Sequence, residues 1–356
     1  MPLSQKRSNC QTEGTILSYG HQGLKEKAAP SRVEEVTSFR RDKSKVTVSV
    51  VKERPMSKSP LYDKYDIQRY DLHPNFSFAH MDTLIPKGTP EYLDHGQHYV
   101  ERIVKALYYF KQCSLIGPSG TGKTHIVYLV AELTGLPLWE VNCGLSTSSF
   151  DLFGRFIGLG KENWVDGILT QWLRRGGIMY LDEANMMKQD VATRLNPVLD
   201  TRGHLVLNEK DSEVIERHKF GYMIISMNPA TAEFSGTKPL NAAMRRRMAV
   251  WINFDFLSIG ETISPNEVEM LQKRSKIDQD MAYKIIQAGA ELRRQYKTGD
   301  LPYGPSLGDL INWATLVHDG YTPMGAAEET IIGLTSDNVE VQADVRRILD
   351  PIFSQT

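Results

Sequence analysis

Cysteine is scarce in this sequence of 356 residues. Cys10, Cys113 and Cys143 lie far apart, and none of them belongs to a CxxC pair. Such spacing provides neither a disulfide framework nor a zinc site, and it favours a reducing cytoplasm. The sequence also lacks an apolar run of about 18 residues, the length of a membrane span, and no apolar stretch follows the charges near its N-terminus. We therefore expect a soluble, unexported protein without a membrane partner.

The net charge of the whole chain is also close to zero, but the positive and negative side chains are unevenly distributed along it. Residues 1–60 contain 12 Lys and Arg against 6 Asp and Glu, a net +6, whereas the remainder contains 30 against 37, a net −7. A basic segment can bind nucleic acid or an acidic partner, but its content of Lys, Ser, Glu and Gln favours a solvated, disordered tail. Its β-like stretch at residues 46–51 can add to a sheet as an edge strand.

Short apolar runs alternate with helical segments in the middle of the chain. The runs are residues 113–116, 138–143, 178–181, 222–227 and 250–254. This alternation indicates an α/β fold with a parallel sheet covered on both faces. After residue 256 only helical patterns remain, at 279–296, 306–318, 323–333 and 339–349. We expect three parts: a largely disordered extension and lead-in at 1–80, an α/β nucleotide-binding domain at 81–257 and a small all-helical lid domain at 258–356.

A glycine-rich loop lies between the first apolar run and an amphipathic helix. It fits the pattern G-x-x-x-x-G-K-[ST] and consists of Gly117, Pro118, Ser119, Gly120, Thr121, Gly122, Lys123 and Thr124. Glycines are needed where backbone N–H groups turn inward around phosphate oxygens. The Lys123 ammonium suits the β- and γ-phosphates, and the Thr124 hydroxyl suits Mg²⁺. The loop therefore predicts a site for ATP and Mg²⁺.

Two further strands end in polar residues that complete such a site. One ends in Asp182 and Glu183. Asp182 can reach the water shell of Mg²⁺, and Glu183 can orient and polarise the attacking water. The next apolar run ends at Asn228, whose amide can hydrogen-bond both the γ-phosphate and that water. Taken alone, its Asn-Pro pair is typical of a turn, but its order in the chain favours the functional role.

Three adjacent arginines, Arg245, Arg246 and Arg247, precede the last strand. On local grounds such a run forms a solvated or partner-binding surface. In an ATPase that assembles as a ring, an arginine at this place reaches the γ-phosphate of the neighbouring subunit. On the residues alone, the surface interpretation is preferred.

In this order, the motifs resemble the AAA+ superfamily and, within it, the MoxR-like branch that contains the CbbQ, NorQ, GvpN and cobalt-chelatase small-subunit proteins. The resemblance extends over about residues 82–256, with a weaker helical lid to about 350. It includes the segments DLFGR at 151–155, WVDGILT at 164–170 and TRGHL at 201–205. It implies a P-loop NTPase three-layer sandwich with a parallel five-stranded sheet, an extra hairpin between residues 207 and 218, and a homo-hexameric ring.

The resemblance also implies roles for the residues that match the family's motifs. Lys123 and Thr124 bind phosphate and magnesium, and Asp182 holds the metal. Glu183 activates water, and Asn228 is the first sensor. In the arginine run, Arg247 best matches the finger that acts on the neighbouring subunit, and Arg245 is the alternative.

One position departs from the family's pattern. The lid helix of such proteins often begins with an arginine that serves as a second sensor, but Gly308 occupies that place here. Glycine has no side chain to contact phosphate. Either Arg293, Arg294 or a neighbour compensates, or the lid responds less to the nucleotide.

Two weaker features remain. Phe156 and Trp164 flank a glycine-rich loop that faces the central pore in related rings, where it can grip a polypeptide; packing beneath the hairpin is the alternative. His95 and His98 have HxxH spacing, but no third metal ligand is evident, so a surface pair is the preferred interpretation.

The leading functional hypothesis is a ring ATPase that remodels or activates a protein partner. Relatives commonly act with a von Willebrand factor A domain, whose Asp-x-Ser-x-Ser pattern is absent here, so that such a domain would come from a separate polypeptide. The alternatives are a motor or nuclease-associated ATPase directed at nucleic acid, for which the basic head is the positive sign, and a nucleotide-dependent scaffold with slow hydrolysis, which Gly308 would explain.

Overall fold

The computed structural model describes residues 64–92, 96–158, 160–200, 202–229 and 239–354. The chain divides into two units, Met1–Glu53 and Arg54–Thr356. The first unit lies outside the described residues, together with the β-like stretch at 46–51. The structure below is therefore that of the second unit.

Five strands form one parallel sheet, as the alternating pattern predicts. Their order is β2-β5-β8-β1-β9, and all four neighbouring pairs are parallel. Strand β8 is buried along its whole length, which explains its continuous apolar sequence. The strand bounds are β1 (Gln112–Ile116), β2 (Leu138–Asn142), β5 (Gly177–Asp182), β8 (Gly221–Met227) and β9 (Trp251–Asn253). Since the strands are parallel, their carboxyl ends meet at one edge of the sheet.

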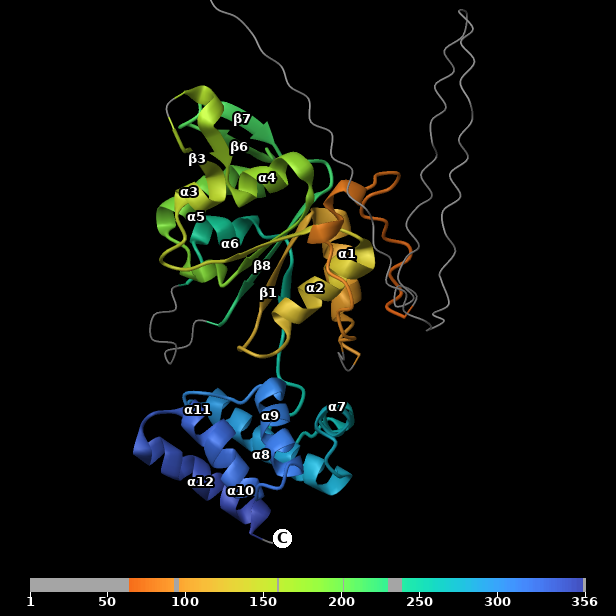
Figure 1. Ribbon diagram of the computed structural model, residues 1–356, viewed down its shortest axis with the longest axis vertical. Coiled ribbons are helices and arrows are strands. Elements are labelled where there is room, and N and C mark those ends of the chain that lie inside the picture. Colours follow the sequence, from red (N-terminus) through yellow and green to blue (C-terminus); the bar gives the residue numbers. More distant parts are fainter. Residues whose placement is uncertain (1–63, 93–95, 159, 201, 230–238, 355–356) are drawn as a thin grey trace, which may run out of the picture. The chain divides into compact units, whose positions relative to one another are not determined.

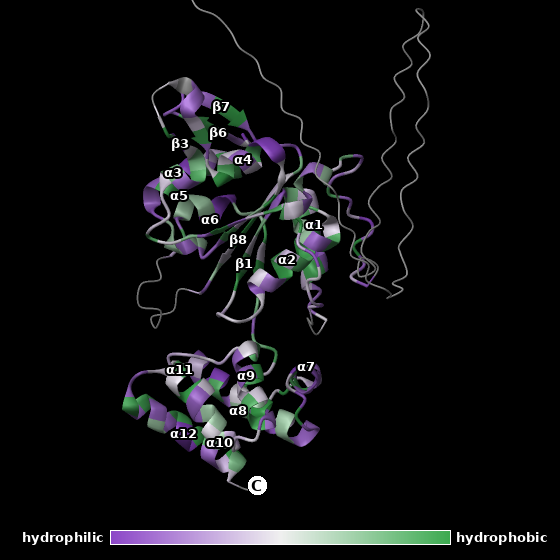
Figure 2. Cartoon of the chain, in the orientation of Figure 1, coloured by the Kyte–Doolittle hydropathy of each residue, from purple (hydrophilic) through white to green (hydrophobic). Residues whose placement is uncertain are grey.

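Helices cover the sheet on both sides (Figure 1). On one side lie α1 and α2, and on the other lie α4, α5 and α6. The covering helices carry both polar and apolar residues along their length (Figure 2). The bounds are α1 (Tyr99–Phe110), α2 (Lys123–Thr134), α4 (Ile168–Arg175), α5 (Gln189–Leu199) and α6 (Ala242–Arg247). The predicted α/β sandwich is confirmed.

Two antiparallel hairpins interrupt the α/β pattern. The first, β3 (Gly154–Phe156) with β4 (Trp164–Asp166), follows the short helix α3 (Ser149–Phe153). The second consists of β6 (His204–Leu207) and β7 (Glu213–Glu216). The sequence places this hairpin between 207 and 218, whereas its strands begin at His204 and end at Glu216. The bounds implied by the resemblance therefore miss most of β6.

Residues 64–85, most of which the sequence assigns to a lead-in, are packed into the core of the sheet domain. Ile67, Tyr70, Leu72 and Phe78 are all buried in the same core as the strands. The Tyr222 hydroxyl of β8 donates to the backbone carbonyl of Leu72. This segment and the 3-10 helix Ala79–Leu84 are thus part of the domain's packing.

The C-terminal part is helical, as predicted, and has a separate hydrophobic core around Leu310 and Trp313. Ser264 caps the first of its helices by accepting a hydrogen bond from the backbone N–H of Glu267. The main helices are α7 (Pro265–Ser275), α8 (Gln279–Thr298), α9 (Leu307–His318), α10 (Pro323–Ala327), α11 (Gly333–Thr335) and α12 (Val339–Phe353). The domain boundaries at 80 and 257 stay predictions. None of the described helices is both long and apolar enough to cross a bilayer.

Candidate functional site

The glycine-rich loop connects β1 to the N-terminus of α2. Gly122 has φ of 84°, in the left-handed region that favours glycine. A Cβ atom at Gly117 would lie 2.5 Å from the backbone oxygen of Phe254, which is too close for any other residue. The first turn of α2, whose backbone N–H groups have no partner within the helix, therefore follows a loop that needs glycine at positions 117 and 122. This is the backbone arrangement that binds phosphate.

Lys123 is buried beneath this loop, with 7% of its surface exposed. Its Nζ atom donates to the carbonyls of Gly117 and Pro118, both at 2.7 Å, and to Oδ1 of Asn228 at 3.1 Å. Burial lowers the pKa of Lys123 to about 8, although the carboxylates of Asp182 and Glu183 oppose the shift. The predicted P-loop lysine and the predicted sensor amide, 105 residues apart, are therefore in direct contact.

The oxygen atoms predicted to hold Mg²⁺ also meet. The hydroxyl of Thr124, on the first turn of α2, donates to Oδ2 of Asp182 at the end of β5, over 3.2 Å. One carboxylate and one hydroxyl are a set of hard oxygen donors that fits Mg²⁺, which usually binds through one or two protein groups together with phosphates and water. Among the described residues no cluster of three or more His, Cys, Asp or Glu side chains offers an all-protein metal site.

Two hydroxyl residues of the site escaped the sequence analysis. The Tyr180 hydroxyl lies 3.2 Å from Oγ1 of Thr124 and donates to Oγ of Ser226 at 3.0 Å. Ser226 in turn donates to Oδ1 of Asp182. Burial raises the pKa of Tyr180, so that the phenol keeps its proton. The available signal is that Tyr180 and Ser226 carry hydroxyls within strands that are otherwise apolar.

Glu183 follows directly after the metal-side carboxylate. Its side chain is exposed at the carboxyl edge of the sheet. Its backbone has φ of 52°, an uncommon conformation for a residue with a side chain, and its N–H donates to Oδ1 of Asp182 at 3.0 Å. Strained backbone of this kind is concentrated at functional sites. The two carboxylates therefore have different environments: Asp182 accepts hydrogen bonds from neighbouring hydroxyls, whereas Glu183 is exposed to solvent.

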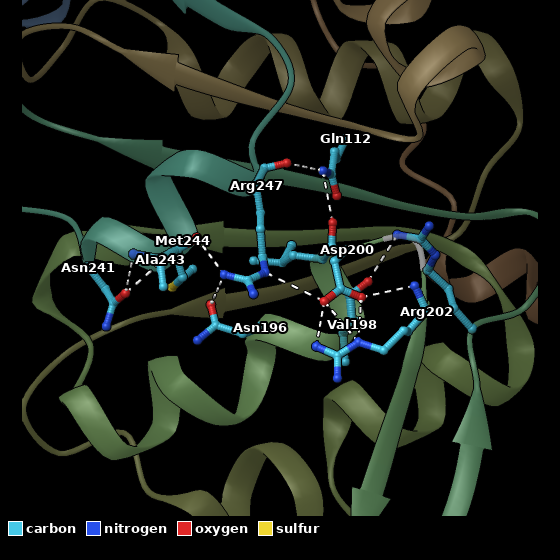
Figure 3. A network of polar contacts seen from close by, with 11 residues as sticks. Gln112, Asn196, Val198, Asp200, Arg202, Asn241, Ala243, Met244 and Arg247 are labelled. Atoms are coloured by element: carbon cyan, nitrogen blue, oxygen red, sulfur yellow. Dashed lines mark hydrogen bonds and ion pairs between the residues drawn. The ribbon is translucent and has the colours of Figure 1, made fainter.

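The three arginines occupy the end of α6, and each has a different environment. Arg245 lies over the ring of Trp251, with 4.8 Å between its guanidinium carbon and the ring centroid. Arg246 is exposed. Arg247 is held within its own subunit: Nη1 donates to the carbonyl of Ala243 at 3.0 Å, and Nε lies 3.7 Å from Oδ2 of Asp200 (Figure 3). Within the described residues, no hydrogen bond or ion pair connects these arginines to the P-loop of the same chain.

Known proteins match this chain over most of its described length. Residues 113–248 match the AAA domain (dynein-related subfamily), and residues 267–352 match the CbbQ/NirQ/NorQ C-terminal family. The denitrification regulatory protein NirQ of Pseudomonas aeruginosa is 32% identical over 264 residues, which cover 74% of this chain and 97% of that protein. The chain belongs to the CbbQ/NirQ/NorQ family of AAA proteins. The expected MoxR-like AAA+ resemblance is thereby confirmed.

Other members of the CbbQ/NirQ/NorQ family match equally well. Protein NorQ of Paracoccus denitrificans is 32% identical over 67% of this chain and 85% of that protein. Protein CbbQ of Hydrogenophilus thermoluteolus is 32% identical over 67% of this chain and 86% of that protein. A solved structure of NtrX from Brucella abortus in complex with ATP covers 74% of this chain and 62% of that chain, at 16% identity and a TM-score of 0.47; a likeness at that level adds nothing to the family assignment.

In this CbbQ/NirQ/NorQ family member, a cavity of about 220 Å³ adjoins the glycine-rich loop. Tyr92 and His125 line one part of its wall, and Met270, Arg274 and Ile311 line another. The Tyr92 hydroxyl donates to the backbone carbonyl of Thr121 at 2.9 Å, which fixes the ring beside the loop. Apolar and aromatic walls next to a phosphate loop can hold the base and sugar of a nucleotide.

Gly308 lies on the wall of the same cavity. A Cβ atom built there would meet only Oγ of Ser306, at an ordinary 3.4 Å, so the first atom of a side chain at this position is not crowded. Arg293 forms an ion pair of 2.9 Å with Glu267, and both side chains are 1% exposed. Arg294 pairs with Glu291 at the surface. Both arginines considered as substitutes are therefore paired with carboxylates, and Arg293 also lines this cavity.

The two hairpins of this AAA protein are connected through α4. Arg174 forms ion pairs with Asp166 of β4 at 2.9 Å and with Glu213 of β7 at 2.7 Å. Phe156 and Trp164 are partners across the β3–β4 pair, and their rings meet edge to face at 5.1 Å. Phe156 is 42% exposed. His95 of the HxxH pair lies outside the described residues.

Proposed function

We propose that this protein is an ATP-hydrolysing AAA+ ring ATPase that remodels or activates a protein partner. The observation that carries the proposal is the convergence of four predicted residues from three segments. Lys123 contacts Asn228, and Thr124 contacts Asp182, at the common carboxyl edge of β1, β5 and β8. Membership of the AAA family supports nucleotide binding at this edge.

Each residue has a separate task in this proposal. Lys123 exchanges its carbonyl partners for the β- and γ-phosphates of ATP, while Thr124 and Asp182 hold Mg²⁺. Bound Mg²⁺ would neutralise charge on the phosphate oxygens. Glu183 polarises the attacking water because its exposed carboxylate is free to accept a proton, and Asn228 orients that water.

Two substitutions test these tasks separately. Lys123→Ala is expected to abolish ATP binding, because the loop loses its side-chain cation. Glu183→Gln is expected to bind ATP normally and to hydrolyse it at least about 10²-fold more slowly, because the amide keeps the shape but cannot act as a base. Calorimetry and phosphate release measure the two effects. Normal ATP affinity in Lys123→Ala, or normal turnover in Glu183→Gln, would contradict the assignment.

Arg247 is proposed as the finger that acts on the neighbouring subunit of a hexameric ring, with Arg245 as the alternative. In the described chain neither side chain contacts its own P-loop, and Arg247 retains about 30% exposure. A finger of this type contributes about 10³ to 10⁵ in rate. Mixing Arg247→Ala subunits with Lys123→Ala subunits is expected to restore partial activity, since some interfaces then pair an intact arginine with an intact loop. Absence of recovery in mixed rings verified by mass spectrometry would exclude Arg247 as the finger.

The hairpin β3–β4 is the surface proposed to meet the protein partner, in a cytoplasmic setting. Ile157 after β3 is 68% exposed and Val165 on β4 is 46% exposed, so this hairpin offers apolar side chains to a partner. A separate protein with a von Willebrand factor A domain is the first partner to test. It is expected to stimulate hydrolysis, and Ile157→Asp is expected to reduce the stimulation, whereas Val339→Asp in the lid is the matched control. Stimulation by single-stranded DNA instead would favour the nucleic-acid hypothesis.

A further inference from the structure

The backbone at Arg247 is tied to the end of α5 by one buried amide. Gln112, at the start of β1, is 6% exposed. Its Nε2 donates to the backbone carbonyl of Leu199, at 3.1 Å, and to the backbone carbonyl of Arg247. A single side chain therefore joins the last residue of α5 to the last residue of α6 (Figure 3). The two helix ends are expected to move as one body.

The Arg247 side chain is held by the same end of α5. Nη1 donates to the backbone carbonyl of Ala243 at 3.0 Å and to Oδ1 of Asn196 at 3.5 Å. Nε is buried and has no hydrogen-bond partner among the described residues; its ion-pair partner is the carboxylate of Asp200, at 3.7 Å. No described contact involves Nη2. Within the described chain, Nη1 is thus hydrogen-bonded and Nε faces a carboxylate, while Nη2 is left for another acceptor.

The Asp200 carboxylate has a second partner besides Arg247, namely Arg202. The backbone N–H of Arg202 donates to Oδ1 at 2.9 Å, and Nη2 of Arg202 donates to Oδ2 at 2.6 Å. The side-chain hydrogen bond from Arg202 is the largest reason that the pKa of Asp200 lies below its usual value, and the Arg247 charge adds to it. The carboxylate is therefore charged at neutral pH, and Arg202 hydrogen-bonds to both of its oxygens (Figure 3).

Asp200 also lies at the base of the β6–β7 hairpin. It follows the last residue of α5, and Arg202 and Gly203 lead from it into β6. On the returning side, the Arg217 backbone N–H donates to the carbonyl of Gly203 at 2.6 Å, and its Nη1 donates to the carbonyl of Val198 at 3.3 Å. The residues around Arg247 are therefore part of a continuous framework that includes the hairpin.

We infer that Asp200 is a positioning residue for Arg247: its carboxylate fixes the guanidinium so that Nη2 is presented to the γ-phosphate bound by the neighbouring copy of this chain. The inference rests on the proposed arginine finger and goes beyond it. A finger must be oriented before the reaction, since a displacement of about 1 Å can cost about 10²-fold in rate. Burial of Nε–H makes a nearby carboxylate the group that compensates its lost hydration. A fully exposed ion pair alone would do little to orient the Arg247 guanidinium. Here the Ala243 carbonyl and the Asn196 amide oxygen restrict the Arg247 side chain as well.

The test compares Asp200→Asn with Asp190→Asn in the full chain. Asp190 is exposed in the first turn of the same helix, so its variant removes an equal charge away from Arg247. Asp200→Asn is expected to lower kcat for ATP about 10²-fold with little change in KM, because the lost contact acts on the neighbour's transition state. Asp190→Asn is expected to retain normal kcat. Thermal unfolding and ring mass are measured alongside.

A double-mutant cycle separates positioning from a structural role. In an Arg247→Ala background, adding Asp200→Asn is expected to change kcat by less than about twofold, because the group that Asp200 orients is already absent. Asp200→Glu keeps the charge and is expected to give a kcat between wild type and Asp200→Asn. It also serves as the readout if the Asn variant does not assemble.

The outcomes distinguish this inference from the proposed finger. If Arg247→Ala hydrolyses ATP at the normal rate, the finger assignment fails. If Arg247→Ala is slow while Asp200→Asn and Asp200→Glu turn over normally, the finger remains and positioning by Asp200 is wrong. A faster Asp200→Asn enzyme, or a full additional loss in the Arg247→Ala background, would also overturn it.

Discussion

A buried ion pair connects two helices of the C-terminal part, and its arginine also contacts the segment that precedes them. Arg293 on α8 and Glu267 on α7 are each 1% exposed, and Nη1 of Arg293 lies 2.9 Å from Oε1 of Glu267. The same guanidinium donates to the backbone carbonyls of Pro305, at 2.7 Å, and Ser258, at 3.1 Å. It also lies 4.8 Å from the centroid of the Phe256 ring. Arg293 therefore satisfies three acceptors from three different segments.

Removal of one member of this pair is expected to be costly. Arg293→Met leaves the Glu267 carboxylate and both carbonyls without their donor, and loss of one partner from a buried pair costs about 3–5 kcal/mol. The double variant Arg293→Met, Glu267→Leu removes both charges, so its loss of stability is expected to be much smaller. Arg294→Met is the matched control: Arg294 is exposed and pairs with Glu291, a kind of pair that contributes about 0–1 kcal/mol.

Hydrogen exchange at the amides of α7 and α8 measures the effect where it is expected. Exchange should accelerate strongly in Arg293→Met, less in the double variant and barely in Arg294→Met. ATP affinity measured on the same proteins distinguishes a structural role of Arg293 from a role in sensing the nucleotide. If Arg293→Met exchanged normally but lost ATP affinity, Arg293 would be a nucleotide sensor after all, and the reasoning from its burial would be refuted.

Three further predictions concern the nucleotide site. The pKa of Lys123 is about 8 in the free protein, and bound phosphates raise it, so ATP binding takes up a proton above pH 8. The affinity for ATP should therefore fall about tenfold per pH unit above pH 8. Calorimetry from pH 7 to 9.5 measures this dependence. Tyr180→Phe removes contacts to Thr124 and Ser226 and should weaken binding of MgATP about tenfold without unfolding the protein; unchanged affinity would contradict a role in holding the metal side. Gly308→Arg should fold normally, because its Cβ meets no close neighbour, and should raise ATP affinity; a loss of stability would contradict the open space seen there.

The agreement between sequence and structure is greatest where the signal is local. The five parallel strands, the helix that begins at Lys123 and the Ser264 cap follow from hydrophobic period, glycine placement and capping chemistry. The sequence also assigned Thr124 and Asp182 separately to one magnesium site, and the structure shows their side chains in hydrogen-bond contact. The less accurate bounds of the β6–β7 hairpin belong to strands too short to establish a period.

The α/β class, the helical C-terminal region and the glycine-rich loop can be read from the sequence, since each of these is encoded in neighbouring positions. Which polar groups are partners depends instead on the folded structure. Gln112 binds carbonyls 87 and 135 positions away, and Arg293 is paired with Glu267 on a different helix. Arg247, which looks like one of three equal arginines in the sequence, is the one that Asp200 holds. Such pairings depend on how helices and strands cross, and no local pattern of residues records that.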